Sequence, residues 1–310
     1  MTTPSNLDSR EDRIAALGYD YAAQPKEVRG RCNLCGYDRF VTLAHRDRYG
    51  YPTRGDGCLR CGLVFLNPVM TAEAYGRFYT DVYRPLVSAY HGRLIDAESI
   101  QDEQREYASS CADFIEPRLR DRSCKTLLDV GGSTGVVAHV MKERFDLLAT
   151  VIDPAPLEIE VARKLGLETV TGFVEDYDSG GATYDFIVLC QTVDHLLDVS
   201  LSLSKIRDLL SEWGLFFVDI VDFRAAYRRN GSVEEAIKID HPYYLTDETM
   251  RAYLARTGFD VLAIDYAADH LHVGYLCAHG KKSFDALPDP ASVSEQWREI
   301  RATQNSLPVV

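Results

Sequence analysis

From Lys125 onward, short apolar runs alternate with stretches of helical periodicity, and this alternation restricts the fold more than any other feature. Strands are predicted at residues 126–130, 147–152, 168–171, 186–190 and 215–220, and helices at 136–144, 157–165 and 201–210. Strands that alternate with helices are joined by crossover connections, which favours a parallel sheet covered on both faces. A helix at 250–256 is followed by two successive strands, at 260–266 and 273–278, and these predict an antiparallel hairpin at one edge. The sequence therefore predicts a doubly wound α/β sheet that is mostly parallel.

Four cysteines have the spacing of metal ligands. Cys32 and Cys35 form one C-x-x-C pair, Cys58 and Cys61 form another, and each pair is followed by a glycine. Two intervening residues let both sulfurs reach one tetrahedral ion, and the glycine permits the tight turn around it. We expect residues 29–68 to form a small zinc-binding module with a structural ion, because four protein ligands leave no open position. Free or redox-active cysteines are the alternative.

The charge balance argues against nucleic acid as a partner. The chain carries a formal net charge of -13, whereas proteins that bind phosphate backbones gain their affinity from Lys and Arg. No apolar run approaches the roughly eighteen residues of a membrane span, and the N-terminal sequence has no signal-peptide pattern. We therefore expect a cytoplasmic protein without a membrane span.

A glycine-rich bend follows the first strand predicted in the sheet, where a doubly wound fold binds a nucleotide. The dinucleotide fingerprint would place glycines at positions 131, 133 and 136, but the chain has Ser133 and Val136. Asp129 precedes the bend, and its carboxylate suits a cationic amino-acid group better than a pyrophosphate. Asp153 ends the next strand, from which an acid can bond ribose hydroxyls.

Both acids and the glycines also have structural interpretations. Asp129 could form a turn, and Asp153 could cap the helix that begins near Pro154. Bare backbone at Gly131 and Gly135 would allow a ligand to approach closely. The occurrence of both acids at the ends of consecutive strands favours the ligand-binding interpretation.

These segments resemble the successive motifs of class I S-adenosylmethionine-dependent methyltransferases. The resemblance rests on residues 127–135, 151–154 and 184–188, with a closing hairpin introduced by residues 257–259. It implies a Rossmann-like methyltransferase sheet with S-adenosylmethionine as cofactor. The cofactor contacts that it implies come from Asp129, Gly131, Gly132, Gly135, Asp153, Pro154, Phe173, Val174, Glu175 and Gln191.

The N-terminal pattern is similar to the zinc-binding module of bacterial sugar and polysaccharide-cluster methyltransferases. The similarity rests on the two cysteine pairs, on residues 62–68 and on Phe78, Tyr79 and Tyr83. It implies a small-molecule substrate, namely a sugar or nucleotide sugar. Some members of that group C-methylate nucleotide-linked deoxysugars and carry a further C-terminal domain, for which this chain ends too soon. That difference favours O-methylation.

Five segments are expected along the chain. Residues 1–28 form an N-terminal extension with a short helix around residues 8–17, and residues 282–310 a loosely attached tail with one short helix at most. Between them we expect the zinc module at 29–68, a helical linker or cap at 69–123 with helices at 71–83 and 95–119, and the S-adenosylmethionine-binding domain at 124–281.

A sugar hydroxyl is a poor nucleophile at neutral pH, so its methylation needs a general base or a metal ion. His195, just beyond the fourth strand, and His241, in the insertion after the fifth, are the candidate bases. A packing role is the alternative for each. His270 and His272 either bind a metal or alternate along an edge strand. A magnesium ion could also be held by Asp194, Asp198, Asp219 and Asp222.

The leading hypothesis is methyl transfer from S-adenosylmethionine to a sugar hydroxyl, with a histidine as general base. The alternatives are C-methylation of a nucleotide-linked deoxysugar, methylation of rRNA, and a non-catalytic protein that keeps the fold. The negative charge argues against rRNA as substrate. The intact motif acids and glycines argue for retained cofactor binding.

Overall fold

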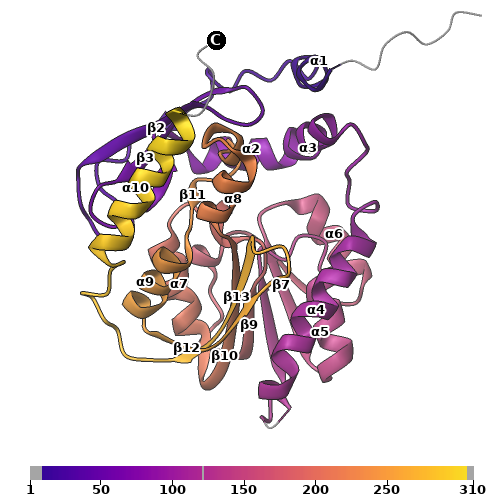
Figure 1. Ribbon diagram of the computed structural model, residues 1–310. Coiled ribbons are helices and arrows are strands. Elements are labelled where there is room, and N and C mark those ends of the chain that lie inside the picture. Colours follow the sequence, from indigo (N-terminus) through magenta and orange to yellow (C-terminus); the bar gives the residue numbers. More distant parts are fainter. Residues whose placement is uncertain (1–8, 121, 306–310) are drawn as a thin grey trace, which may run out of the picture.

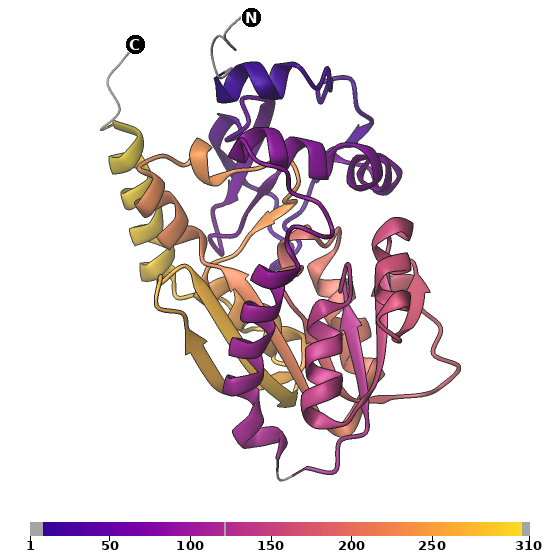
Figure 2. The same cartoon turned by 90° about the vertical axis from the view of Figure 1, so that its right-hand side faces the viewer.

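A computed structural model describes residues 9–120 and 122–305, in which a central sheet flanked by helices carries a smaller sheet above one end (Figure 1). The helices and strands that precede residue 92 lie over that same end, and Figure 2 shows this arrangement from the side. Within the described residues, no helix is both long enough and apolar enough to cross a membrane.

The central sheet has seven strands in the order β12-β13-β10-β9-β6-β7-β8. They are β6 (Thr126–Val130), β7 (Leu148–Asp153), β8 (Glu168–Thr171), β9 (Tyr184–Leu189), β10 (Leu210–Val221), β12 (Phe259–Tyr266) and β13 (His272–His279). Strands β6 to β10 run parallel, whereas β13 lies antiparallel between β10 and β12. The predicted doubly wound, mostly parallel sheet with an antiparallel hairpin is confirmed. His272 therefore begins an inner strand and does not lie on the edge strand.

Two apolar layers cover the faces of this sheet. Successive side chains of a strand point to opposite faces, so Leu127 and Phe186 pack in one layer, and Leu128 and Ile187 in the other. The first layer is covered by α4 (Gln101–Leu119), α5 (Val136–Phe145) and α6 (Pro156–Lys164), and the second by α7 (Val199–Leu209) and α9 (Asp247–Thr257). Burial of each such side chain contributes about 1.5–3 kcal/mol, and this placement leaves the strand ends free to form a site.

The cysteine-rich segment contributes three strands to a second sheet, whose order is β11-β4-β3-β2. These strands are β2 (Phe40–Arg46), β3 (Pro52–Cys58) and β4 (Val64–Leu66). The fourth, β11 (Tyr243–Tyr244), comes from the insertion after β10 and pairs with β4, with Tyr243 opposite Phe65. A separate two-stranded ribbon joins β1 (Lys26–Glu27) to β5 (Val69–Met70). The insertion and the N-terminal segment therefore share one sheet.

Three helices precede α4 and lie above the strand ends. They are α1 (Arg10–Ala15), α2 (Ala72–Asp81) and α3 (Tyr83–His91). Residue 8 of the helix predicted at residues 8–17 lies outside the described residues. α3 lies between the two helices predicted at residues 71–83 and 95–119 and was not predicted. Pro85 stands in the first turn of α3, where an amide hydrogen would have no helical partner.

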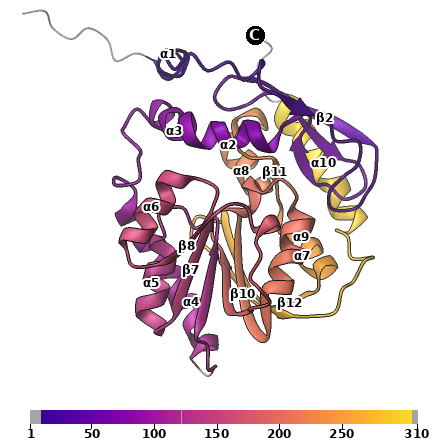
Figure 3. The same cartoon turned by 180° about the vertical axis from the view of Figure 1, so that it is seen from behind.

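The C-terminal segment differs most from its prediction. It forms α10 (Pro290–Asn305), a helix of 16 residues, so the expectation of a loosely attached tail with one short helix was wrong. Val293 and Ile300 are buried, and Gln296 Nε2 donates to the carbonyl of Gly62 at 2.9 Å. Glu299 forms an ion pair at 3.1 Å with Arg224 of α8 (Phe223–Asn230). The helix thus packs between α8 and the N-terminal sheet, as Figures 1 and 3 show.

Candidate functional site

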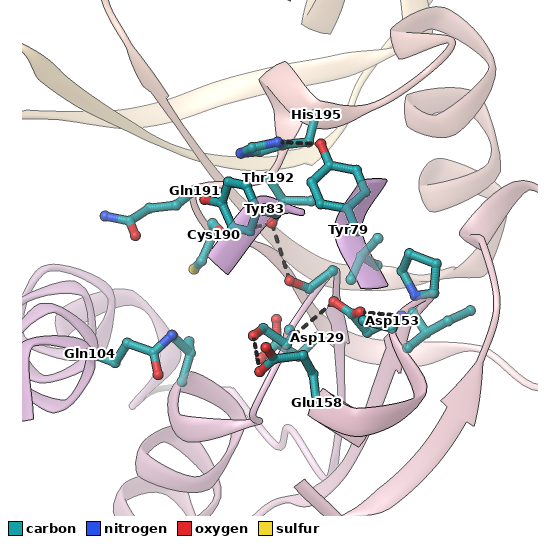
Figure 4. Close-up of a pocket in the computed structure, with 18 of the residues that line it drawn as sticks. Tyr79, Tyr83, Gln104, Asp129, Asp153, Glu158, Cys190, Gln191, Thr192 and His195 are labelled. Carbon is teal, nitrogen blue, oxygen red and sulfur yellow. Dashed lines mark hydrogen bonds between the residues drawn. The ribbon is translucent and has the colours of Figure 1, made fainter. Parts of the chain in front are cut away.

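A cavity of about 560 Å³ lies at the carboxyl ends of β6, β7 and β9, covered by α3 and α4. Its walls include nine of the ten residues predicted to bind the cofactor, namely Asp129, Gly131, Gly132, Asp153, Pro154, Phe173, Val174, Glu175 and Gln191. His195 also lines the cavity. In Figure 4, His195 and Tyr79 lie at one end of it, and Asp129 and Asp153 lie at the other.

The glycines of the bend serve different purposes. Gly131 has a φ of 67°, and a Cβ atom there would lie 2.3 Å from Cγ2 of Thr192, so only glycine lets the two loops meet. Gly135 has a φ of 75° but does not line the cavity. A Cβ atom at Gly135 would instead meet Leu167 and Ala162. The expectation that Gly135 gives a ligand close approach is therefore wrong, because this glycine accommodates the packing of α5 on its neighbours.

Asp129 is the next-to-last residue of β6, and its carboxylate is buried. Its Oδ2 accepts a hydrogen bond from the amide of Ala138 at 3.2 Å, whereas its Oδ1 has no partner among the described residues. Burial raises the pKa of Asp129 to about 7. A buried carboxylate oxygen without a donor is costly, so this position calls for a cationic or hydrogen-bonding ligand group.

Asp153 ends β7 and turns its carboxylate toward the bend. The amides of Ala155 and Ser133 donate to its two oxygens at 2.8 and 2.9 Å, and burial raises the pKa of Asp153 to about 6. The cap role and a ligand role are compatible, because each carboxylate oxygen can accept a second hydrogen bond. Next to Asp153, the loop of Phe173 and Val174 lines the cavity.

His195 joins the cavity wall through a short 3₁₀ turn and contacts Tyr79. The Tyr79 hydroxyl donates to the carbonyl of Asp240 at 2.9 Å, so its oxygen can accept from Nδ1–H of His195 at 2.8 Å. This pattern assigns the proton of neutral His195 to Nδ1 and leaves a lone pair on Nε2. Burial, followed by the charge of nearby His241, lowers the pKa of His195 to about 4. At neutral pH, His195 is therefore an uncharged proton acceptor.

His241 lies behind His195, with their ring centroids 4.3 Å apart, and does not line the cavity. Its Nδ1 lies 2.8 Å from Asp194 Oδ2, and its Nε2 lies 3.3 Å from Asp240 Oδ2. Burial opposes a charge on this imidazole, but the carboxylates outweigh burial and raise the pKa of His241. His241 thus lies between two carboxylates that favour its charged form, and it lines a second cavity of about 290 Å³.

The alternative metal ligands of the sequence analysis do not converge. Among the described residues, no cluster suited to a metal contains His270, His272 or the predicted set of four aspartates. Asp198 and Asp222 cap the first turns of α7 and α8, and Asp219 accepts hydrogen bonds from the Gln191 amide at 2.6 Å and the Tyr107 hydroxyl at 2.8 Å. These acids serve separate structural roles.

Two clusters in the described part of the chain have the geometry of a metal site. One of them comprises Asp194, His195 and His241. Two of its members already pair with each other, and Lys238 Nζ lies 3.4 Å from His241 Nε2, where its charge would repel a cation. This arrangement favours a proton-handling group over a metal ion.

The other cluster consists of the four predicted cysteines, whose sulfurs all lie within 4.8 Å of one another. Sulfur–sulfur distances are 3.5 Å for Cys32–Cys61 and for Cys35–Cys58. A disulfide needs about 2.05 Å, whereas sulfurs bound tetrahedrally at about 2.3 Å to one zinc ion lie roughly 3.8 Å apart. The glycine after each pair has positive φ and donates its amide to the first cysteine of the pair. These turns present four thiols that fit a zinc ion.

The sequence model of one protein family, described as "Methyltransferase domain", matches residues 102–264, more than half of the chain. The chain belongs to this family. The match covers the bend, the cavity acids and His195, whereas α2 and α3, which also line the cavity, lie outside the matched residues.

Curated relatives resemble parts of the chain. A probable (S)-tetrahydroprotoberberine N-methyltransferase 2 from Papaver bracteatum is 24% identical over 196 residues, which cover 57% of this chain and 54% of that protein. A ubiquinone biosynthesis O-methyltransferase from Methylocella silvestris is 31% identical over 97 residues, which cover 29% of this chain and 38% of that protein. The chain thus spans about half or less of the length of these relatives, and their names include transfer to nitrogen as well as to oxygen.

Solved structures resemble the methyltransferase domain. An S-adenosylmethionine-dependent methyltransferase from Clostridium acetobutylicum has a TM-score of 0.49 and 15% identity, covering 56% of this chain and 92% of that chain. The glycopeptide N-methyltransferase MtfA in complex with S-adenosylmethionine has a TM-score of 0.45 and 13% identity, covering 56% of this chain and 93% of that chain.

Sequence reasoning missed several residues that surround the two histidines. Asp240 was not a candidate, although it directly precedes His241, and Asp194 was considered only as a magnesium ligand. Both acids are buried and contact the imidazole of His241. Their positions beside the two histidines were the available signal, since acids that flank histidines often set their charge. Tyr79, which the sequence suggested as part of the N-terminal similarity, contacts the His195 ring through its hydroxyl.

Proposed function

We propose that this chain transfers a methyl group from S-adenosylmethionine to a hydroxyl of a sugar or nucleotide sugar. The observation that carries the proposal is the buried, unpartnered Oδ1 of Asp129 in a cavity that His195 also lines. The donor's amino-acid ammonium group matches what that oxygen lacks. When bound, S-adenosylmethionine supplies an electrophilic methyl group on a sulfonium.

Different cavity residues bind different parts of the cofactor. Asp129 accepts from the ammonium group, and the bare backbone at Gly131 and Gly132 leaves room for the amino-acid tail. The carboxylate of Asp153 accepts from ribose hydroxyls at the end of the second strand, β7. Phe173 and Val174 border the adenine ring. Binding of this kind positions the donor, and positioning is the larger part of catalysis in a direct displacement.

His195 acts as the general base in this proposal. Its Nε2 takes the proton of the acceptor hydroxyl as the oxygen acquires the methyl group. The imidazolium so formed lies 4.0 Å from Asp194 Oδ1, and the carboxylate stabilises it. His241 does not face the cavity, so we assign it a positioning role. It holds the Asp194 carboxylate that faces His195.

The cysteine module supports the loop that follows His195. Asn33, which lies between two of the cysteines, donates to Asp198 at 2.7 Å, and Arg29 donates to the carbonyl of Leu197 at 2.9 Å. A zinc ion held by the four cysteines would fix this knuckle and, through these contacts, the start of α7. The ion's role in the proposal is structural.

The acceptor class rests on the similarity of the N-terminal pattern to sugar methyltransferases and on the net charge of -13, which disfavours rRNA. The test is calorimetry with S-adenosylhomocysteine, followed by a labelled-methyl assay on a panel of nucleotide sugars. Nuclear magnetic resonance of the product distinguishes an O-methyl from a C-methyl group. Binding without transfer to any sugar, or transfer to rRNA alone, would contradict the proposal.

A further inference from the structure

The second cavity, of about 290 Å³, lies on the far side of the His195–His241 pair from the cofactor cavity. Three cationic side chains line it, namely Arg48, Arg229 and Lys238. Among the described residues, none of the three forms an ion pair with a carboxylate. Lys238 lies close enough to the buried carboxylates of Asp194 and Asp240 to lower the pKa of both, whereas no such partner is seen for Arg48 or Arg229 within the part of the chain that the structure describes. A cluster of three cations is notable in a chain whose net charge is -13.

Arg48 carries the clearest sign of a missing ligand. Its Nε is buried and has no hydrogen-bond partner in the described part of the chain. Its guanidinium lies 4.7 Å from the ring centroid of Tyr90, and Arg10 lies 4.3 Å from the same centroid. Stacking holds the guanidinium plane but satisfies none of its N–H groups. An acceptor in the cavity would supply the missing hydrogen bond.

The loops that carry these cations are rigidly joined. The amide of Arg48 donates to the carbonyl of Ile237 at 2.9 Å, and Asp47 Oδ2 accepts from the amide of Ile239 at 2.9 Å. The Tyr244 hydroxyl donates to the carbonyl of Lys238 at 2.6 Å and accepts from its amide at 2.8 Å. Because the backbone is fixed before a ligand arrives, less entropy is lost on binding.

The carboxylates that border the cavity do not neutralise it. Asp194 and the neighbouring Asp240 are paired with His241 at 2.8 and 3.3 Å, and Glu235 is an exposed residue. Asn230 adds an uncharged polar group to the wall. Three cations around so small a volume exceed the charge of one carboxylate ligand, whereas a diphosphate brings several charged oxygens.

We propose that this second cavity binds a phosphoryl or diphosphate group of a small molecule through Arg48, Lys238 and Arg229. The identification of that molecule as the methyl acceptor rests on the proposed function, whereas the anion site does not. His195 lines the cofactor cavity and His241 lines the second cavity, and their ring centroids are 4.3 Å apart, so the anion site lies directly behind the proposed base.

The test is calorimetric titration of the full chain with sodium pyrophosphate, with and without saturating S-adenosylhomocysteine. We expect saturable binding that weakens by about tenfold or more in Arg48→Gln and in Lys238→Gln, since each loses a charge-assisted contact worth roughly 1.5–3 kcal/mol. Arg46→Gln is the matched control, because Arg46 lies two residues from Arg48, is exposed and pairs with Glu234. It should bind pyrophosphate as the wild type does.

Arg229→Gln adds a variant that cannot disturb the core, because Arg229 is exposed at the end of α8. Succinate at equal ionic strength tests whether a dicarboxylate suffices, and we expect it to bind far more weakly than pyrophosphate. Absence of pyrophosphate binding, equal binding by succinate, or affinity unchanged in all three cavity variants would overturn the anion site. Loss of S-adenosylhomocysteine binding alone would count only against the proposed function.

Discussion

Nδ1 of His241 lies 2.8 Å from Oδ2 of Asp194, in a contact between side chains that are 9% and 13% exposed. The His241 ring lies 4.3 Å, centroid to centroid, from that of His195. Burial, and after it the proximity of His241, whose charged form Asp194 and Asp240 favour, lowers the pKa of His195 to about 4. The Asp194–His241 pair therefore adds to the effect of burial on the histidine that lines the cofactor cavity.

Replacement of the proposed base should stop transfer and spare cofactor binding. We expect His195→Gln to lower turnover by about 100-fold or more, the range for loss of a general base, with S-adenosylhomocysteine affinity changed only slightly. His45→Gln, at an exposed position on β2, is the control and should leave both quantities unchanged. Turnover of His195→Gln within a few-fold of wild type would remove His195 from the base role.

The positioning role of His241 predicts a change in the pH profile. With the cofactor kept saturating at each pH, wild-type turnover should be nearly constant between pH 5 and 8, because His195 with a pKa of about 4 stays neutral there. In His241→Asn the neighbouring positive charge is gone and Asp194 is unpaired, so the pKa of His195 rises toward its ordinary value of 6.5. Turnover should fall by about tenfold, and the acid limb of the plot of turnover against pH should move to higher pH. An acid limb at the same pH as in the wild type would contradict the electrostatic coupling of His241 to His195.

Asp129 predicts a pH dependence of cofactor affinity. With a pKa of about 7 in the free protein, its carboxyl must lose a proton to pair with the ligand ammonium at lower pH. S-adenosylhomocysteine affinity should therefore fall by about tenfold per pH unit below pH 7 and level off above it. Asp129→Asn should bind about 10–100-fold more weakly at pH 8 and show a flat profile. Calorimetry from pH 6 to 8 measures both quantities.

The Asp129 carboxyl should also make the stability of the ligand-free protein depend on pH. Since burial raises the pKa of Asp129, the stability linked to this carboxyl is complete below the ordinary aspartate pKa of 3.8 and is lost as pH rises through about 7. The melting temperature of the free protein should drop over that window less in Asp129→Asn than in wild type. An identical drop in both proteins would show that Asp129 is ionised without cost.

The four cysteines predict one zinc ion per chain and a dependence of folding on it. Chelation, or Cys35→Ser, should remove the metal and lower the melting temperature by about 10 °C, which corresponds to roughly 3–5 kcal/mol in a large domain. Cys124→Ser is the matched control, because Cys124 is also a half-buried cysteine but lies outside the cluster. Elemental analysis that finds no zinc in the wild type, with an unaltered melting curve, would refute the metal site.

The fold of the central sheet could be predicted because its information is local. Strands β6 and β8 begin and end at the predicted residues, and strand–helix alternation dictates parallel pairing. The cluster of the two cysteine pairs could be predicted for the same reason, since the ligand spacing of each pair is set within four residues.

Other features depend on contacts between distant segments and leave no local trace. The two residues of β11 are a strand only because β4 lies beside them, and a two-residue run has no periodicity. The orientation of His241 toward Asp194, and away from the cofactor cavity, is fixed by the same insertion. Gly135 shows the same limit, because its φ was predictable from its residue type but not its neighbours Leu167 and Ala162.

Gly131 allows the closeness of the two cavity loops to be tested directly. A Cβ atom at this position would lie 2.3 Å from Cγ2 and 2.9 Å from Oγ1 of Thr192, and the backbone has a φ of 67°. Gly131→Ala should therefore combine backbone strain of about 1–2 kcal/mol with a clash that pushes the Thr192 loop away from the bend. Because both loops line the cofactor cavity, S-adenosylhomocysteine affinity should fall together with the melting temperature.

Gly180→Ala separates strain from clash, because Gly180 has a φ of 61° and nothing within 4 Å of its added Cβ. That variant should lose stability only by the strain and bind S-adenosylhomocysteine like the wild type. Gly131→Ala combined with Thr192→Ser, which removes the nearest carbon of Thr192, should recover part of the lost affinity. Equal affinities in Gly131→Ala and Gly180→Ala, measured by calorimetry, would mean that the cofactor does not depend on how closely these loops meet.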